Sequence, residues 1–319
     1  MREAGAAALA DAGLTERDVG AVAFVSQAPR GELVDALGRR VTVLSGATAL
    51  HLAWQEVATG ARDIVLCVGH DGARERTPAS PIEALAEGAK AYMASSGATE
   101  RHFARIAAKN RGHGAANPRA LLTEPAGADE ILASELLAWP LHRLMVAPVA
   151  EAAAAVVLAG GDVRRRAGAE GPQVCASVIV HEGDGEARAA TARAARLAYQ
   201  MAALGPEDVD CAEIDDRTAA VELASYEPLL LVPEGRGPEL VESGFTALGG
   251  VLPVNTSGGT IALGDAGSAS ALAQLCELAW QLRGEAGRRQ VAGAHVGLAL
   301  HRGGGQGAPF VSLTILSSG

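Results

Sequence analysis

The chain alternates short apolar runs with amphipathic stretches, which is the pattern of an α/β protein. In the first part this pattern predicts helices over 3–13, 31–37 and 45–57, and strands over 22–25, 41–44 and 63–68. The strand over 63–68 is a continuous apolar run, as expected for a strand that is covered on both faces of its sheet. The beginning of the chain is therefore predicted to be a layered α/β unit.

The pattern loosens between Gly69 and Trp139, where prolines separate short helical pieces such as 102–110. We interpret about 70–140 as an inserted loop domain. An apolar strand is predicted over 152–158, and the Gly- and Arg-rich stretch 160–172, with three arginines at 164–166, is interpreted as a solvated linker.

After this linker the pattern begins again. Strands are predicted over 174–180, 211–214 and 310–315, and helices over 187–203 and 219–229. The most informative stretch, 251–307, is predicted to form a buried strand, a Gly/Ser turn, an amphipathic helix and a second buried strand that ends in another glycine turn. Both glycine loops then lie at one edge of a sheet, where α/β proteins bind ligands.

Two short matches indicate an internal repeat. LTERDV at 14–19 matches LGPEDV at 204–209, and HLAWQE at 51–56 matches ELAWQL at 277–282. The matches occur in the same order in each part, so we predict two duplicated halves, 1–160 and 173–319. Trp54 and Trp280 then occupy equivalent helix positions.

Composition excludes several classes of function. The 319 residues are 49% hydrophobic and carry a formal net charge of -10, which argues against nucleic acid as the main partner. The four cysteines are scattered without a CxxC pair, which favours buried thiols in a reducing compartment and no metal site. The sequence shows neither a signal-peptide pattern nor a membrane-span pattern, so a cytoplasmic protein is predicted.

Three long segments carry a family resemblance. Residues 92–120, 140–158 and 278–300 resemble the thiolase superfamily, specifically its lipid-transfer members of the sterol carrier protein X type. The resemblance implies a five-layer α/β/α/β/α sandwich of two duplicated halves, with a loop domain inserted in the first half, and usually a dimer.

The resemblance also implies four catalytic positions. Val43 falls where the family has its nucleophilic cysteine, and Asp215 where it has an Asn or His. Asp265 falls on the histidine base of the Gly-His-Pro turn. The histidine of the last glycine loop falls on Leu300 or, with a one-residue slip, on His301. Because thiolysis needs an acyl carrier and a base, ordinary thiolase activity is not expected.

Each remaining candidate residue has two alternative interpretations. Ser45 is the nearest alternative nucleophile or a helix N-cap, and Asp265 is a base or an N-cap. Asp215 and Asp216 form either an acid/base pair or a solvent-facing pair at the end of a strand. His301 is a site residue or a hydrogen-bonded polar residue.

The resemblance implies a CoA-thioester site at the two glycine loops and no other cofactor. The predicted binding residues are Asn255, Ser257, Gly258, Gly259, Gly303 and Gly304. Family members open with a glycine-containing strand, expected at the centre of the first sheet, whereas this sequence opens in the first helix. We expect another segment or another chain in that place, or a rebuilt half-sheet.

Three functions stay open. The first is a degenerate thiolase-like subunit that binds acyl-CoA or lipid, or supports an active thiolase-like chain. The second is a retro-aldol C–C lyase or an acyltransferase that acts on CoA thioesters with an OB-fold, zinc-ribbon partner; such relatives use tyrosines, and here neither glycine loop contains one. The third is a structural subunit like a chain-length factor. A homodimer or heteromer is predicted through the sheet edge at 41–44 and the helix that follows it.

Overall fold

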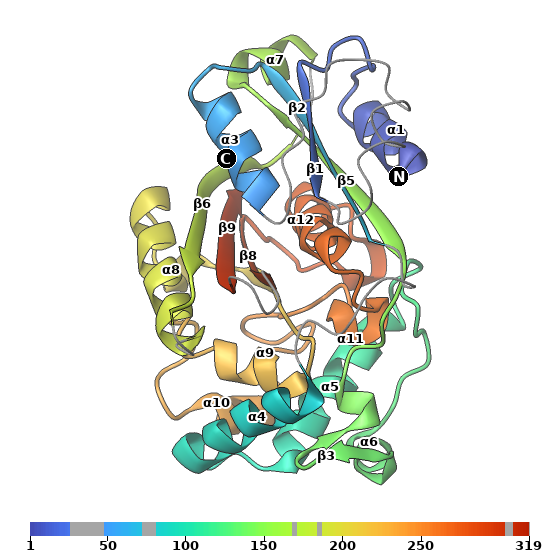
Figure 1. The fold of residues 1–319 in the computed structure, drawn as a ribbon, viewed down its shortest axis with the longest axis vertical. Helices are drawn as coiled ribbons and strands as arrows, with labels where there is room; N and C mark the ends of the chain where they lie inside the picture. Colours follow the sequence, from blue (N-terminus) through green and yellow to red (C-terminus); the bar gives the residue numbers. More distant parts are fainter. Residues whose placement is uncertain (26–47, 72–80, 168–170, 184–186, 304–308, 319) are drawn as a thin grey trace.

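Two mixed β-sheets pack on either side of helix α12 (Ser268–Arg283), which contacts strands of both (Figure 1). The computed structural model describes residues 1–25, 48–71, 81–167, 171–183, 187–303 and 309–318. The predicted elements over 31–37 and 41–44, together with Val43, Ser45 and Gly304, lie outside these residues.

The first sheet has the order β1-β2-β5. Strand β1 (Ala21–Val25) runs parallel to β2 (Ile64–Asp71), and β5 (Ala152–Ala159) runs antiparallel to β2. Helix α1 (Arg2–Asp11) packs on β2 and β5, while α3 (Thr48–Ala58) contacts this sheet and also β6 of the other sheet.

The second sheet has the order β6-β9-β8-β7. Its strands are β6 (Gln173–His181), β7 (Cys211–Ile214), β8 (Val296–Gly303) and β9 (Phe310–Ser317). Helix α8 (Ala187–Ala202) packs on β6 and β9. The layers are therefore α1, the first sheet, α3 with α12, the second sheet, and α8, which confirms the predicted five-layer sandwich (Figure 1).

The two sheets repeat one topology. Strand β7 is parallel to β8 and β9 is antiparallel to β8, just as β1, β2 and β5 are related. Trp54 lies on α3 before β2, and Trp280 lies on α12 before β8, so the predicted equivalence of the two helices is confirmed. Strand β6 lies at the edge of its sheet, beside β9. The strand that family members place first therefore corresponds to an edge position, and the expected central position is wrong.

The segment between β2 and β5 forms the lower part of the molecule in Figure 1. It packs against elements of the second half through one large apolar core. Its elements are α4 (Ile82–Ser96), α5 (Glu100–Gly114), α6 (Ala128–Ala133), β3 (Leu136–Ala138), β4 (Leu141–His142) and the 3-10 turn η2 (Arg143–Met145). Their neighbours from the second half include α9 (Ala219–Ser225), α10 (Gly237–Glu242) and α11 (Gly259–Leu263).

Three predicted elements differ in the structure. The linker contains α7 (Gly161–Ala167), whose last turn carries the arginine run and in which Arg165 pairs with Asp162. The strand expected from Val251 is reduced to one bridge between Val254 and Ala212. The helix predicted over 219–229 ends at Ser225. Two further 3-10 turns are η3 (Pro206–Asp208) and η4 (Gly287–Arg289).

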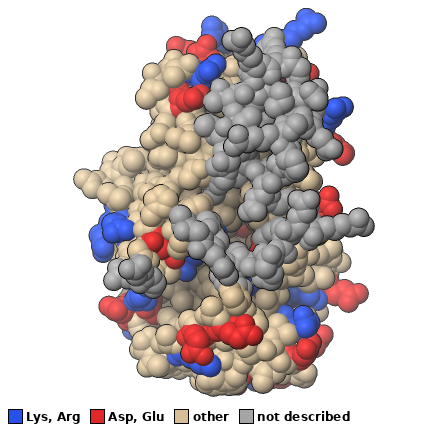
Figure 2. Space-filling model, viewed as in Figure 1, with Lys and Arg blue, Asp and Glu red and all other residues tan. Residues whose placement is uncertain are grey.

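The described surface carries charges of both signs. On the face in Figure 2, lysine and arginine are interspersed with aspartate and glutamate. No described helix has the length and apolar character needed to cross a membrane.

Candidate functional site

A buried ion pair lies at the carboxyl ends of β7 and β8. Strand β7 ends at Ile214, and the next amide, of Asp215, donates to the carbonyl of Leu300 on β8 (2.9 Å). The Arg217 guanidinium donates to both carboxylate oxygens of Asp215, from Nε to Oδ1 at 3.0 Å and from Nη2 to Oδ2 at 2.5 Å. Its Nη2 also donates to the carbonyl of Arg302 (2.6 Å), so Arg217 ties the two strand ends together.

Two other predicted site residues act electrostatically on this pair. Burial opposes ionisation of Asp215, but Arg217 and, less strongly, His301 hold its pKa at about 2. Burial likewise opposes the charge on Arg217, whereas Asp215 and, less strongly, Asp265 raise its pKa. We call Asp215, Arg217, Asp265 and His301 the Arg217 cluster. The structure thus brings together three of the predicted candidates around an arginine that the sequence reasoning missed.

The backbone fixes Asp265 in this cluster. Its N–H donates to the carbonyl of Pro148 (2.7 Å), and its carbonyl accepts from the N–H of Ala150 (3.0 Å). Its Oδ1 accepts from the N–H of Gly267 (2.9 Å), the residue directly before α12. Asp265 therefore binds the backbone at the start of α12 from two positions upstream of the cap residue.

Asp216 points to a different place from Asp215. It accepts hydrogen bonds from the N–H and hydroxyl of Thr260 and from the N–H of Ile261, at the start of α11, and from Nδ2 of Asn110. Burial, followed by the charge of Glu222, raises its pKa to about 7. The two aspartates are 4% and 0% exposed, so the interpretation as a solvent-facing pair is wrong, and their partners separate their roles.

The Gly/Ser loop is held by its own polar side chains. Oδ1 of Asn255 accepts from the N–H of Ile214 (2.7 Å), and its Nδ2 donates to Glu222 (2.7 Å). The hydroxyl of Ser257 donates to Glu213 (2.5 Å). Both side chains are buried.

Backbone conformation explains the glycines of this loop. Gly258 and Gly259 have φ of 98° and 60°, where a side chain is strained. A Cβ at Gly259 would collide with the Asp216 carboxylate, so the glycine allows that contact. Gly303, from the second predicted loop, is the last residue of β8 and pairs with Phe310.

Two more carboxylates missed by the sequence reasoning lie behind the loop. Glu213 and Glu277 are each 1% exposed, and both accept from the hydroxyl of Thr256. Arg289 donates to Glu277 at 2.9 and 2.7 Å, so the guanidinium compensates one charge of the pair. Burial and the nearby Glu277 raise the pKa of Glu213. A charged residue inside an apolar run was the signal that could have identified this pair.

The four cysteines lie on strands β2, β6 and β7 and on helix α12, outside the Arg217 cluster. All four are free. Burial raises the pKa of the Cys67 and Cys276 thiols to about 12, and it also raises the pKa of Cys175 and Cys211. None of these thiols is prepared to act as a thiolate nucleophile. Among the described residues, no cluster of His, Cys, Asp and Glu fits a metal ion.

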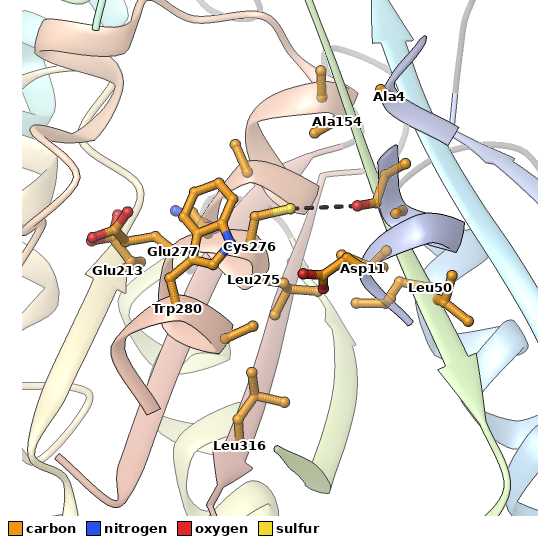
Figure 3. Close-up of a pocket in the computed structure, with 18 of the residues that line it drawn as sticks. Ala4, Asp11, Leu50, Ala154, Glu213, Leu275, Cys276, Glu277, Trp280 and Leu316 are labelled. Carbon is orange, nitrogen blue, oxygen red and sulfur yellow. Dashed lines mark hydrogen bonds between the residues drawn. The ribbon is translucent and has the colours of Figure 1, made fainter. Parts of the chain in front are cut away.

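A cavity of about 720 Å³ extends from this loop to the first sheet (Figure 3). Ser257 and Gly259 line one part, and Trp54 and Trp280 line another. The Arg119 guanidinium lies 4.2 Å from the centre of the Trp280 ring, so the indole is held by a cation–π contact.

Comparisons with known proteins agree with this fold. Residues 173–317 match the family described as Thiolase C-terminal domain-like. The chain is 31% identical to the acetyl-CoA acetyltransferase of Methanothermobacter thermautotrophicus over 98% of this chain and 93% of that protein. It is 32% identical to sterol carrier protein 2 of Rattus norvegicus over 84% of this chain, and the match spans 56% of that longer protein. The solved Ltp2-ChsH2(DUF35) aldolase has a similar fold, with a TM-score of 0.85, 22% identity, and coverage of 98% of this chain and 91% of that one. The chain therefore belongs to the thiolase family.

Proposed function

We propose that this chain is a thiolase-fold subunit without thiolytic chemistry, which acts by binding an acyl-CoA or lipid ligand or by supporting a partner chain. One observation carries the proposal: the positions matched to two catalytic residues of the family hold Asp215 and Asp265, both within reach of the charge of Arg217. An arginine-bound carboxylate of pKa about 2 stays ionised and cannot donate a proton near neutral pH.

The described thiols support the same conclusion. Covalent acyl transfer by cysteine needs a thiolate, and burial raises the pKa of each of the four thiols. Val43, which cannot form a thioester, occupies the matched nucleophile position in the sequence. The buried hydrogen bonds of Asn255 and Ser257 give the loop a fixed shape that a CoA thioester would meet at Gly258, Gly259 and Gly303.

The test combines chemistry with binding. Purified protein is incubated with acetoacetyl-CoA and analysed by intact-mass spectrometry, with a parallel thiolysis assay and calorimetry with a non-hydrolysable CoA thioester. We expect no adduct, no thiolysis and measurable binding or a co-purifying partner. An acyl adduct on Ser45 or Cys67 would overturn the non-thiolytic proposal. Loss of that adduct in Ser45→Ala would identify a serine-based enzyme.

A C–C lyase is the second candidate, because the chain shares its fold with a protein named as an aldolase in complex with a DUF35 chain. The tyrosines argue against it. The hydroxyls of Tyr92, Tyr199 and Tyr226 bond within the core, to Glu227, to the carbonyl of Leu229 and to Glu222. Retro-aldol cleavage of a β-hydroxyacyl-CoA, assayed with an OB-fold, zinc-ribbon protein present, separates the two candidates.

A further inference from the structure

Thr260 belongs both to the wall of the large cavity and to the buried contacts of Asp216. It is half-buried in the first turn of α11 and lines the cavity of about 720 Å³ together with Ser257 and Gly259. Its hydroxyl donates to Oδ1 of Asp216 (2.7 Å). Because a hydroxyl has a single proton, Thr260 cannot also donate to a ligand in the cavity while this bond holds.

Asp216 lies against this wall without a compensating cation. It is 0% exposed, and a Cβ at Gly259 would collide with its carboxylate, so the carboxylate sits against the glycine backbone of the cavity wall. Lys109 pairs with Glu222, and in the described part of the chain no cation pairs with Asp216. Burial, followed by the charge of Glu222, raises the pKa of Asp216 to about 7, so its carboxylate can take up a proton near neutral pH.

The donors around Asp216 decide where a proton on its carboxyl group can point. The backbone N–H groups of Thr260 and Ile261 can only donate. The Nδ2 of Asn110 donates to Asp216 (2.8 Å) and to Glu222 (2.6 Å), so an inverted amide would turn its oxygen toward both carboxyl groups. The Thr260 hydroxyl can reverse, because it accepts as well as donates. A protonated Asp216 therefore donates to Thr260 and frees the hydroxyl proton of Thr260.

The titratable side chains next to Asp216 are bound to partners of their own. Glu222 of α9 accepts from Nζ of Lys109 on α5 and from the hydroxyl of Tyr226. The adjacent Asp215 is bound by the guanidinium of the Arg217 cluster. The reversible Thr260 contact is therefore specific to Asp216.

A similar contact joins Ser257 to Glu213 in the same loop. The Ser257 hydroxyl donates to Glu213, and both residues line the cavity, where Figure 3 labels Glu213. Ser257 is 2% exposed, whereas Thr260 is half-buried. Thr260 is therefore the hydroxyl that a ligand in the cavity reaches more easily.

We propose that Thr260 binds the thioester carbonyl of an acyl-CoA ligand, and that this contact is coupled to the uptake of one proton by Asp216. The inference rests on the proposed ligand-binding role of the Gly/Ser loop. The ligand carbonyl accepts the hydroxyl proton of Thr260, a proton from solvent binds Asp216, and Asp216 then donates to the Thr260 oxygen. The site thereby selects CoA thioesters over CoA derivatives that lack the carbonyl, and it does so more strongly as the pH falls.

The experiment compares butyryl-CoA with S-butyl-CoA, a thioether that lacks only the carbonyl oxygen. Calorimetry on the full chain measures the Kd across neutral pH, and buffers of different ionisation enthalpy report the number of protons taken up. Because Asp216 titrates at about 7, we expect the Kd of butyryl-CoA to rise about tenfold per pH unit above that value, with about one proton taken up. S-butyl-CoA carries the same phosphates, so the difference between the two ligands isolates the carbonyl.

Substitutions assign the proton and the donor. Asp216→Asn carries an N–H in place of the carboxyl proton and should bind butyryl-CoA with the pH dependence of S-butyl-CoA. Thr260→Val removes the hydroxyl and should make the two ligands bind alike, whereas Thr260→Ser, the matched control, should keep their difference. If Asp216→Asn fails to fold, the proton count on the unsubstituted chain decides.

The outcomes separate this inference from the proposed function. Failure of both ligands to bind would contradict the ligand-binding form of the proposed function, and this inference with it. Binding of both ligands with one pH dependence and no extra proton for butyryl-CoA would overturn the inference alone. A difference between the ligands that survives in Thr260→Val and disappears in Ser257→Ala would assign the carbonyl to Ser257 and exclude the role of Thr260.

Discussion

Arg217 holds Asp215 in a two-pronged ion pair although both side chains lie largely out of solvent, at 19% and 5% exposure. Removing the arginine leaves the carboxylate buried without its guanidinium partner. We expect Arg217→Met to lower the free energy of unfolding by about 3–5 kcal/mol at pH 7, measured by urea denaturation. Arg143→Met, at an exposed pair with Glu135, is the control and should cost about 1 kcal/mol or less. Equal losses would contradict a compensating role for Arg217.

The same pair predicts acid sensitivity. The pKa of Asp215 is depressed to about 2 in the folded protein, below the value near 3.9 typical of an unfolded chain. Its stabilising contribution is therefore complete above about pH 4 and is lost as the pH falls toward 2. Asp215→Asn should reduce the slope of stability against pH in this window, as followed by urea midpoints.

Glu213 predicts the opposite slope at higher pH. Burial and Glu277 raise its pKa above that of an unfolded glutamate, so the folded protein keeps a proton that the unfolded chain releases. Stability should fall as the pH rises from about 4.5 through the raised pKa. Glu213→Gln removes the titrating group and should flatten this decline. An unchanged slope in the variant would show that Glu213 is ionised in the folded protein.

Gly259 is expected to tolerate no side chain. Its φ is 60°, and a Cβ would collide with Asp216, so Gly259→Ala should cost more than about 2 kcal/mol of unfolding free energy. Gly284, with φ of 74° and open space within 4 Å of where a Cβ would lie, is the matched control. Gly284→Ala should cost about 1 kcal/mol, since only the backbone strain applies. Similar losses of unfolding free energy in both variants would show that a collision with Asp216 does not add to the cost at Gly259.

The thiols give a test of burial. Maleimide labelling of the folded protein, read by peptide mass spectrometry, should modify Cys175 first, because its side chain is half-buried. Cys67 and Cys211 should react only after unfolding, since they are buried and their pKa values are raised. Rapid labelling of Cys67 in the native protein would indicate an activated thiol and would weaken the non-thiolytic proposal.

Strong periodicity predicted the regular elements well. The strand over 211–214 has the expected bounds, and the helix predicted over 187–203 is one residue shorter. The strand expected from Val251 failed because Pro253 has no N–H to donate and the run makes a single bridge. The arginine run was interpreted as a linker, although Asp162 and Arg165 form the i,i+3 pair typical of a helix.

The candidate site was harder to predict, because its geometry depends on partners far apart in the sequence. Adjacent aspartates at the end of a strand usually face water. Here the fold brings Asp216 to the start of α11, and it brings Asp215 to Arg217, which also binds the carbonyl of Arg302. The resemblance located Asp215, Asp265 and His301 at one edge of the sheet, but it gave no sign of Arg217. The functional roles of these residues stay predictions.

The core formed between the inserted segment and the second half has a consequence for how the protein comes apart. Phe103 and Ile106 of α5 belong to the same apolar cluster as Leu223 and Leu298, and Lys109 bonds both Glu222 and the carbonyl of Val254. The inserted segment and the second half are therefore expected to unfold together as one cooperative unit, although β5 separates them in the sequence. A fragment cut out at 173–317 would expose the apolar surface that α5 covers, so the second half cannot be separated from the inserted segment without the loss of part of its core.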